Sequence, residues 1–151
     1  MYYYDGDITN IKGIRFKDTG TVDLKPTGHP CVIPIETCIN EDYLYFLTMT
    51  SNPNEATKKD GNCILVKMDK TNRLRKPSYI NLRHVYKVKK QGFATTGTLR
   101  KPDYQRMIEG IFSCCEVLKD QDYLDIESEL IKRYSPAYHE VAPTSEQNKI
   151  K

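Results

Sequence analysis

Long hydrophobic runs are missing from this sequence of 151 residues. A helix needs roughly 20 apolar residues to cross a bilayer, and no stretch approaches that length, so we expect no transmembrane segment. The first seven residues, MYYYDGD, are neither basic nor apolar, whereas a secretory signal peptide combines a basic start with an apolar run. We therefore expect a cytoplasmic protein with no membrane partner.

Cysteine is scarce and poorly placed for bonding. The five cysteines are an odd number, none lies in a C-x-x-C motif, and Cys114 and Cys115 are adjacent. Cys31, Cys38 and Cys63 lie in or beside apolar runs, where free cysteine is usually a small buried core residue. The HExxH, P-loop and GxGxxG motifs are also missing. We expect no disulfide, no metal, no cofactor and no thiol nucleophile.

Charge is distributed unevenly along the chain. Residues 58–106 contain 14 Lys and Arg against 3 Asp and Glu, a net charge of +11. The remaining residues contain 9 Lys and Arg against 17 Asp and Glu, a net charge of −8. This asymmetry is typical of a protein that binds a polyanion such as nucleic acid. The alternative is a solvated lysine-rich face, and a membrane surface is disfavoured because no amphipathic helix accompanies the charge.

Alternating and β-branched segments predict strands in the first 90 residues. The turn sequence NED at residues 40–42 separates two of these segments, which therefore predict a hairpin. Pro34 inside the first of the two indicates an edge strand or a bulge. The predicted strands are residues 7–14, 31–39 (CVIPIETCI), 43–49 (YLYFLTM), 62–67 and 80–88 (INLRHVYKV).

Helical periodicity occurs only toward the C-terminus. A first helix is predicted from Pro102, with Tyr104, Met107, Ile108, Ile111, Phe112, Cys115 and Leu118 at helical spacing. A second is predicted over residues 122–134, with Tyr123, Ile126, Leu130 and Tyr134 on one side. Residues 135–151 are polar and predict a mobile tail. The prediction is one α+β domain over residues 1–134, a compact twisted antiparallel sheet or small barrel with C-terminal helices.

Polar residues gather at two predicted strand ends. Lys25 and His29 lie in KPTGHP, directly before residues 31–39, and Thr50, Ser51 and Asn52 follow the next strand. In a hairpin, the start of one strand lies beside the end of the other, so His29 and the two hydroxyls would be neighbours. RNA supplies its own nucleophile, the 2′-OH, and its cleavage needs an acid and a base, for which histidine is best suited near neutral pH. Hydroxyls and a cation would stabilise the charged phosphorane.

Each of these residues has an ordinary structural alternative when it is taken alone. His29 in a Pro-Gly loop would be a surface or capping residue, and residues 50–53 would be a turn. His84 in the middle of a predicted strand and His139 in the tail fit catalysis less well. Some of the 11 tyrosines could stack on unpaired bases. The candidate RNA-binding residues are Asn52, Lys58, Lys59, Lys76, Arg83, Lys87, Lys89, Lys90 and Tyr104.

The order of five short motifs resembles a family of ribonucleases. They are YDGDI (residues 4–8), GHPCVI (28–33), LTMTS (47–51), YINLR (79–83) and PDYQRM (102–107). The first three resemble the PemK/MazF-like ribonuclease toxins. All five, with their spacing, resemble the type III toxin–antitoxin toxins of the ToxN, AbiQ and CptN group, over residues 5–118.

This resemblance implies an SH3-like barrel and sequence-selective RNA cleavage that leaves a 2′,3′-cyclic phosphate and a 5′-OH. It also implies inhibition by a pseudoknot RNA antitoxin bound in a basic groove, in a closed RNA–protein oligomer. The hydroxyl pair of the family falls on Thr50 and Ser51. Its basic catalytic residue, commonly Lys or Arg, falls on His29, so either His29 or Lys25 takes the acid–base role, with Lys25 and Arg83 stabilising phosphate charge. The aromatic residue that some members carry shortly before this point is missing.

Two other functions fit the same sequence. One is a PemK/MazF-type toxin that is inhibited by a protein antitoxin. The groove of the toxin would then accept an acidic peptide. The other is an SH3-like RNA-binding module without catalytic activity.

Overall fold

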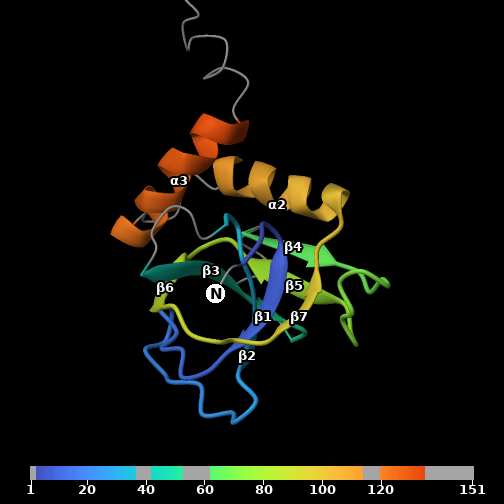
Figure 1. Ribbon diagram of the computed structural model, residues 1–151, viewed down its shortest axis with the longest axis vertical. Helices are drawn as coiled ribbons and strands as arrows, with labels where there is room; N and C mark the ends of the chain where they lie inside the picture. Colours follow the sequence, from blue (N-terminus) through green and yellow to red (C-terminus); the bar gives the residue numbers. More distant parts are fainter. Residues whose placement is uncertain (1–2, 37–41, 53–61, 114–119, 135–151) are drawn as a thin grey trace, which may run out of the picture.

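A computed structural model describes residues 3–36, 42–52, 62–113 and 120–134. These residues form an α+β structure in which a curled antiparallel sheet is covered at one end by two helices (Figure 1). Its elements are β1 (Asp7–Ile11), β2 (His29–Val32), β3 (Tyr43–Thr50), β4 (Cys63–Val66), β5 (Ser78–Asn81), β6 (Tyr86–Lys89), β7 (Thr95–Thr98), α2 (Lys101–Ser113) and α3 (Gln121–Tyr134).

The sheet curls around its longest strand, β3. The strand order is β4-β5-β3-β2-β1-β7, and β6 also pairs with β3. The first half of β3 pairs with β6, from Tyr43 to Phe46, and its end pairs with β5, at Met49 and Thr50. Because one strand has different partners along its length, the sheet bends into half of a barrel. The predicted antiparallel hairpin of β2 and β3 is confirmed.

The single strand predicted over residues 80–88 is wrong. The structure has two strands there, β5 and β6, joined by residues 82–85. Leu82 and Val85 are both buried in the core, although residues three apart point to opposite faces of a continuous strand. The chain turns between them so that both apolar side chains reach the core, and the alternation of apolar residues hides this break.

Other strand boundaries also differ from the prediction. The strand predicted over residues 7–14 ends at Ile11, two residues before Gly13, which has a positive φ of 70°. The next strand begins earlier than predicted, at His29, and ends at Val32. It lies between β1 and β3, so Pro34 follows an interior strand and marks neither an edge nor a bulge. The polar strand β7 was not predicted at all.

The predicted helices are confirmed within the described residues. On α2 the buried residues are Met107, Ile108 and Ile111, and on α3 they are Tyr123, Ile126 and Leu130, as their spacing predicts. Pro102 lies in the first turn of α2, where its missing N–H costs no helical bond.

Some predicted features lie outside the described residues: Cys38, Cys115, Leu118 and the tail of residues 135–151. Cys31 is fully buried, as predicted, and Cys63 is half-buried.

Two hydrophobic cores lie on opposite faces of the sheet. The larger core joins the sheet to the helices and contains Leu47, Met49 and Ile80. The smaller core lies inside the curl and contains Cys31 and Phe46. Residues alternate between the two along β2 and β3, so a side chain's position along either strand tells which core it faces.

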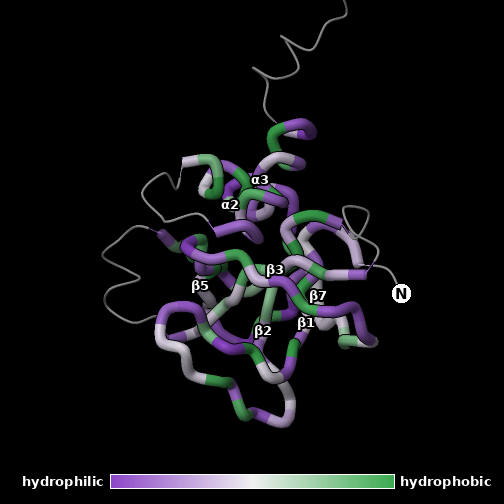
Figure 2. The backbone as a smooth tube through the Cα atoms, turned by 90° about the vertical axis from the view of Figure 1, so that its left-hand side faces the viewer, coloured by the Kyte–Doolittle hydropathy of each residue, from purple (hydrophilic) through white to green (hydrophobic). Residues whose placement is uncertain are grey.

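The β1–β2 loop (residues 12–28) lies at the end of the sheet opposite the helices, as the two views in Figures 1 and 2 agree. It folds back on itself through a bridge between Arg15 and Val22 and a hydrogen bond from Phe16 N to Thr21 O (2.8 Å). This loop packs against the start of β2, where His29 lies.

Candidate functional site

The β2–β3 hairpin carries the residues that the sequence assigns to catalysis. Cys31 pairs with Thr48 in antiparallel register. Two residues closer to the start of β2, the same register sets His29 opposite Thr50. The imidazole also interacts with the main chain of Met49. His29 and Thr50 are therefore neighbours at one end of the hairpin.

Both side chains lie on the face of the sheet that forms the smaller core. Cys31 on β2 and Phe46 on β3 belong to that core, and His29 and Thr50 are an even number of residues away from them. Thr50 is also the strand partner of Tyr79 on β5, and directly opposite residues share a face. Three neighbouring strands thus present an imidazole, a hydroxyl and a half-buried phenol in one row. Tyr79 lies in the YINLR motif, but the sequence analysis did not assign it to the site.

The imidazole of His29 is largely enclosed, with its side chain 13% exposed. The ring of Phe16 meets it edge-on, with centroids 5.1 Å apart. Burial lowers the pKa of His29, and the carboxylate of Asp23 and the main chain of Met49 oppose this shift only in part, while Lys25 adds to it. His29 is therefore a neutral imidazole at neutral pH, the form that accepts a proton.

Asp23 is a site residue that the sequence analysis missed. Its Oδ2 lies 3.7 Å from Nδ1 of His29, and its side chain is 6% exposed. Oδ2 is buried and has no hydrogen-bond partner among the described residues, while Oδ1 accepts from Lys25 N (3.1 Å). Such a carboxylate stabilises a protonated imidazole beside it. No motif marks Asp23, because the turn-rich sequence around it predicts only a loop.

Gly28 sets the position of His29. The turn before it closes through a hydrogen bond from Gly28 N to Lys25 O (3.1 Å). Gly28 has a φ of 84°, and a Cβ there would lie 3.1–3.2 Å from main-chain atoms of Asn10 and Ile11. Only glycine fits both conditions. Lys25 itself is exposed on this turn, close enough for its charge to lower the pKa of His29.

The end of β3 exposes the other predicted catalytic residue. Thr50 is half-buried, and Ser51 and Asn52 are exposed. Oγ1 of Thr50 accepts a hydrogen bond from Asn52 N (3.1 Å). Its own hydroxyl proton therefore remains available to a ligand.

Two of the predicted RNA-binding residues, Lys58 and Lys59, lie outside the described residues.

Arg83 and His84 lie in the break between β5 and β6, so the prediction that His84 lies in mid-strand is wrong. Nε2 of His84 is 2.7 Å from Oδ1 of Asp18, and Nε of Arg83 is 3.8 Å from the same oxygen. Both residues therefore bind the β1–β2 loop through Asp18. This pairing reduces the share of the Arg83 charge that is available to a phosphate.

The lysines of β6 are not at the site. Lys89 is the partner of Tyr43, so it lies at the opposite end of β3 from Thr50, up to about 23 Å away along an extended strand. Lys87 is 3.9 Å from Asp122, and its ammonium group lies 4.6 Å from the centroid of the Tyr43 ring. The predicted role of Lys87 in RNA binding competes with both contacts.

Three predicted RNA-binding lysines remain open to a ligand. Lys76 and Lys89 are exposed and Lys90 is half-buried, and none has an acidic partner among the described residues. Lys76 precedes Tyr79, the strand partner of Thr50, by three residues. It is therefore the member of this group that lies nearest to His29 along the sheet.

The side chain of Tyr104 is held by a hydrogen bond and by packing against the larger core. Its hydroxyl donates to Pro34 O and lies 3.4 Å from the hydroxyl of Tyr134, and its ring packs against the larger core. Burial raises its pKa strongly. The predicted role of Tyr104 in RNA binding competes with these contacts, because its ring is half-buried against the larger core.

Two other kinds of site are missing from the described residues. No helix among them is long and apolar enough to cross a membrane. No group of three or more His, Cys, Asp or Glu is placed to hold a metal ion.

Comparison with known proteins does not add a family. No protein-family model matches the chain, and no curated protein matches it.

Stability should depend on the titration of His29. The pKa of His29 is lowered below 6.5 by burial. In a pH range below 6.5, His29 is therefore protonated in the unfolded chain but still neutral in the folded protein. The free energy of unfolding should therefore fall as the pH drops below about 6.5 and recover as it rises. Urea denaturation at about pH 7.5 and about pH 5.5 measures this loss. His29→Gln should show a smaller loss than the wild type, and an equal loss would contradict the assignment.

Proposed function

We propose that this chain is a cytoplasmic endoribonuclease that cleaves RNA without a metal ion. The observation that carries the proposal is the enclosed imidazole of His29 beside the hydroxyl of Thr50 at one end of the β2–β3 hairpin. A base and a hydrogen-bond donor are two of the groups that phosphodiester transesterification requires.

The reaction begins with the 2′-OH of the RNA. His29 accepts the proton of this hydroxyl as the 2′-oxygen attacks phosphorus. Thr50 and Ser51 donate hydrogen bonds to the phosphate oxygens, whose charge increases in the transition state. The bond from phosphorus to the 5′-oxygen breaks, and this oxygen takes a proton from Lys25 or from protonated His29. The products are a 2′,3′-cyclic phosphate and a 5′-OH. Asp23 stabilises the imidazolium while His29 holds the proton.

The resemblance to type III toxins extends the proposal. The curled sheet would then be an SH3-like barrel of the PemK/MazF type, and the chain would be inhibited by a pseudoknot RNA in a closed complex. Protein produced with its native upstream DNA should copurify with a discrete RNA. Short tandem repeats in that DNA would support an RNA antitoxin, and a small acidic reading frame would support a protein antitoxin instead.

The direct test is incubation of the purified chain with mixed RNA in EDTA. Cleavage fragments should carry cyclic phosphate and 5′-OH ends, which end-specific kinases and phosphatases distinguish. A matched RNA with a single 2′-deoxy sugar at the mapped cut should resist cleavage there, because it lacks the nucleophile. If no cleavage occurs, or if the deoxy substrate is cut equally, the proposal fails.

A second candidate function is RNA binding without cleavage. The observation in its favour is that the His29 side chain is only 13% exposed, which would suit a structural residue. A module of this kind would bind RNA through Lys25 and Lys76 and leave it intact. The EDTA incubation separates the two functions.

Loss of the Thr50 hydroxyl should slow cleavage. Thr50→Val keeps the shape of the side chain and removes its donor, so we expect a decrease in kcat of about 10²-fold, the usual effect of losing one donor to a developing oxyanion. Single-turnover cleavage rates measure this. Ser128→Ala, which removes an exposed hydroxyl from α3, is the control. A Thr50→Val protein as fast as that control would remove Thr50 from the mechanism.

A further inference from the structure

A second concave surface lies near the start of β2. It is a pocket of about 350 Å³ lined by Asn10, Lys12, Thr27, Gln91, Gly92, Phe93 and Ala94. Asn10 is the strand partner of Pro30, and the next residue, Ile11, is the partner of His29. Strand partners are about 5 Å apart between Cα atoms, so this pocket, called here the Asn10 pocket, adjoins the His29 segment. Asn10 is one residue from Ile11, so its side chain lies on the opposite face of the sheet from the imidazole of His29.

The loop that forms one wall of the Asn10 pocket is fixed by a buried tyrosine. Tyr3 is 1% exposed, and its hydroxyl donates to Gln91 O (2.6 Å) and accepts from Phe93 N (2.9 Å). Asn10 N also donates to Ala94 O (3.3 Å). The pocket is therefore formed before any ligand arrives, which lowers the entropic cost of binding.

The chemistry of its lining suits one nucleotide. The amides of Asn10 and Gln91 each offer a donor and an acceptor, which can match the edge of a base, and the ammonium group of Lys12 can pair with a phosphate. Among the described residues, no carboxylate lines the Asn10 pocket. Its volume lies near the lower end of the range for small-ligand sites, about 300–1,000 Å³, so it admits a single unpaired nucleotide and excludes a duplex.

A pocket at the start of α2 provides a contrast. It is of similar size, about 370 Å³, but Asp69 and Asp103 line it together with its basic residues. The guanidinium of Arg106 already donates to Asp103 (2.9 Å) and to Leu65 O (3.0 Å). The two carboxylates offset two of its three cationic side chains, Lys67, Arg100 and Arg106, and Arg106 is already engaged. We therefore place the nucleotide in the Asn10 pocket.

We propose that the Asn10 pocket binds one unpaired nucleotide of the RNA, a short distance along the RNA strand from the nucleotide that is cleaved, and reads its base through Asn10 and Gln91. This inference rests on the proposed ribonuclease function and adds the part of the protein that selects the cut sequence. Lys12 binds the phosphate of that nucleotide, so its contribution is independent of the base.

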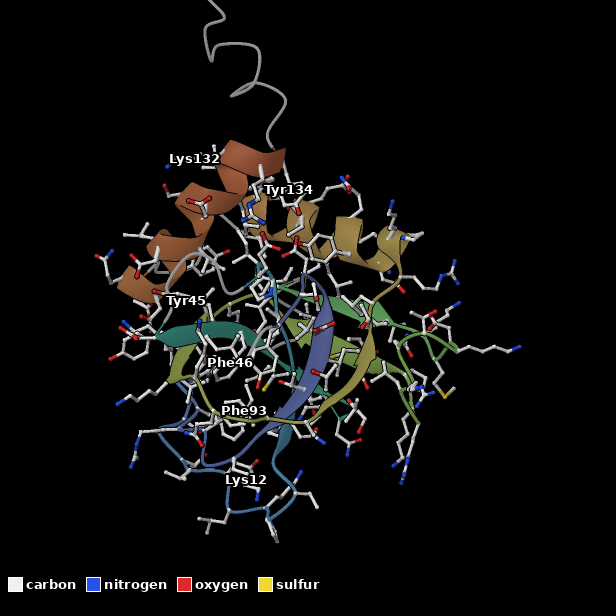
Figure 3. All side chains as sticks on the ribbon, viewed as in Figure 1. Lys12, Tyr45, Phe46, Phe93, Lys132 and Tyr134 are labelled. Atoms are coloured by element: carbon white, nitrogen blue, oxygen red, sulfur yellow. The ribbon has the colours of Figure 1, made fainter. Side chains whose placement is uncertain are left out.

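The test combines a cleavage assay and a binding assay on the full-length chain. An RNA library randomised around the mapped cut gives the base preference at each position. A 2′-O-methyl RNA of about ten nucleotides, which has no free 2′-OH and cannot be cleaved, gives the affinity. The variants are Gln91→Ala and Lys12→Gln, both at exposed positions. The control is Lys132→Gln on α3, at the opposite end of the molecule from Lys12 and Phe93 (Figure 3).

Gln91→Ala should flatten the base preference at one position near the cut and weaken binding of the preferred base about tenfold. Lys12→Gln should weaken binding of all bases alike and reduce the salt dependence by about one unit. Lys132→Gln should match the wild type. If the wild type cleaves RNA and neither variant differs from it, the pocket proposal is overturned while the proposed function stands.

The reverse outcome is also distinguishable. A wild-type chain that binds the 2′-O-methyl RNA with the expected dependence on Gln91 and Lys12, but cleaves no RNA, would disprove the ribonuclease and keep the nucleotide site. A chain that neither binds nor cleaves RNA would disprove both proposals.

Discussion

His29→Gln is expected to slow RNA cleavage by about 10²- to 10⁴-fold, the range for loss of a general acid or base. Glutamine keeps a hydrogen-bonding side chain of similar size, but it cannot take the proton of the 2′-OH. The effect should fall on kcat, because in the proposed mechanism the imidazole acts on the reacting atoms and contributes little to holding the RNA chain. Single-turnover cleavage at saturating protein measures it directly.

His84→Gln is the matched control for this prediction. His84 is also paired with an aspartate, Asp18 (2.7 Å), so the two variants lose the same type of side chain from a similar setting. We expect the cleavage rate of the His84 variant to lie within about tenfold of the wild-type rate, because His84 positions a loop and has no catalytic role in the proposed mechanism. Equal losses in both variants, or cleavage by His29→Gln at the wild-type rate, would remove His29 from the catalytic role.

Gly97→Ala is expected to cost about 3 kcal/mol of stability, at the upper end of the range for overpacking. A Cβ at Gly97 would lie 2.1 Å from the carbonyl oxygen of Asn72 and 2.6 Å from its carbonyl carbon. These are main-chain atoms, so a side-chain rotation cannot relieve the contact. Asn72 is itself 1% exposed. Its side chain is fixed by hydrogen bonds to the main chain of Asp69, Leu74 and Lys67.

Urea denaturation of the Gly97 variant measures the loss as a lower midpoint at an unchanged slope. The control is Thr95→Ala, on the same strand and exposed, which should change stability by less than about 0.5 kcal/mol. A Gly97→Ala protein as stable as this control would mean that β7 and the Asn72 loop do not approach each other as closely as described.

The proximity of His29 and Thr50 could be predicted because it depends on local structure. Two apolar runs with turn residues between them form a hairpin, and a hairpin sets the start of one strand beside the end of the other. His29 and Thr50 follow from that rule alone. Asp23 could not be predicted in the same way, because its position depends on how the β1–β2 loop folds back through the bridge between Arg15 and Val22.

The charge around His29 was the least predictable part of the candidate site. The net charge of +11 over residues 58–106 says nothing about which acidic side chains lie nearby. The fold brings Asp122 of α3 to Lys87 and Asp18 of the β1–β2 loop to Arg83. The charges that remain open to a ligand near His29 are thereby reduced to a few residues, including Lys25 and Lys76.

The sequence by itself determined the α+β class, the β2–β3 hairpin and the buried faces of α2 and α3, because each depends on a repeat of polar and apolar residues within one segment. Only the tertiary structure decided where the chain breaks between β5 and β6, that polar β7 joins the sheet, and which carboxylate faces His29. These features depend on contacts between segments far apart in the chain, where burial and pairing with a distant partner outweigh the local preference of the residues.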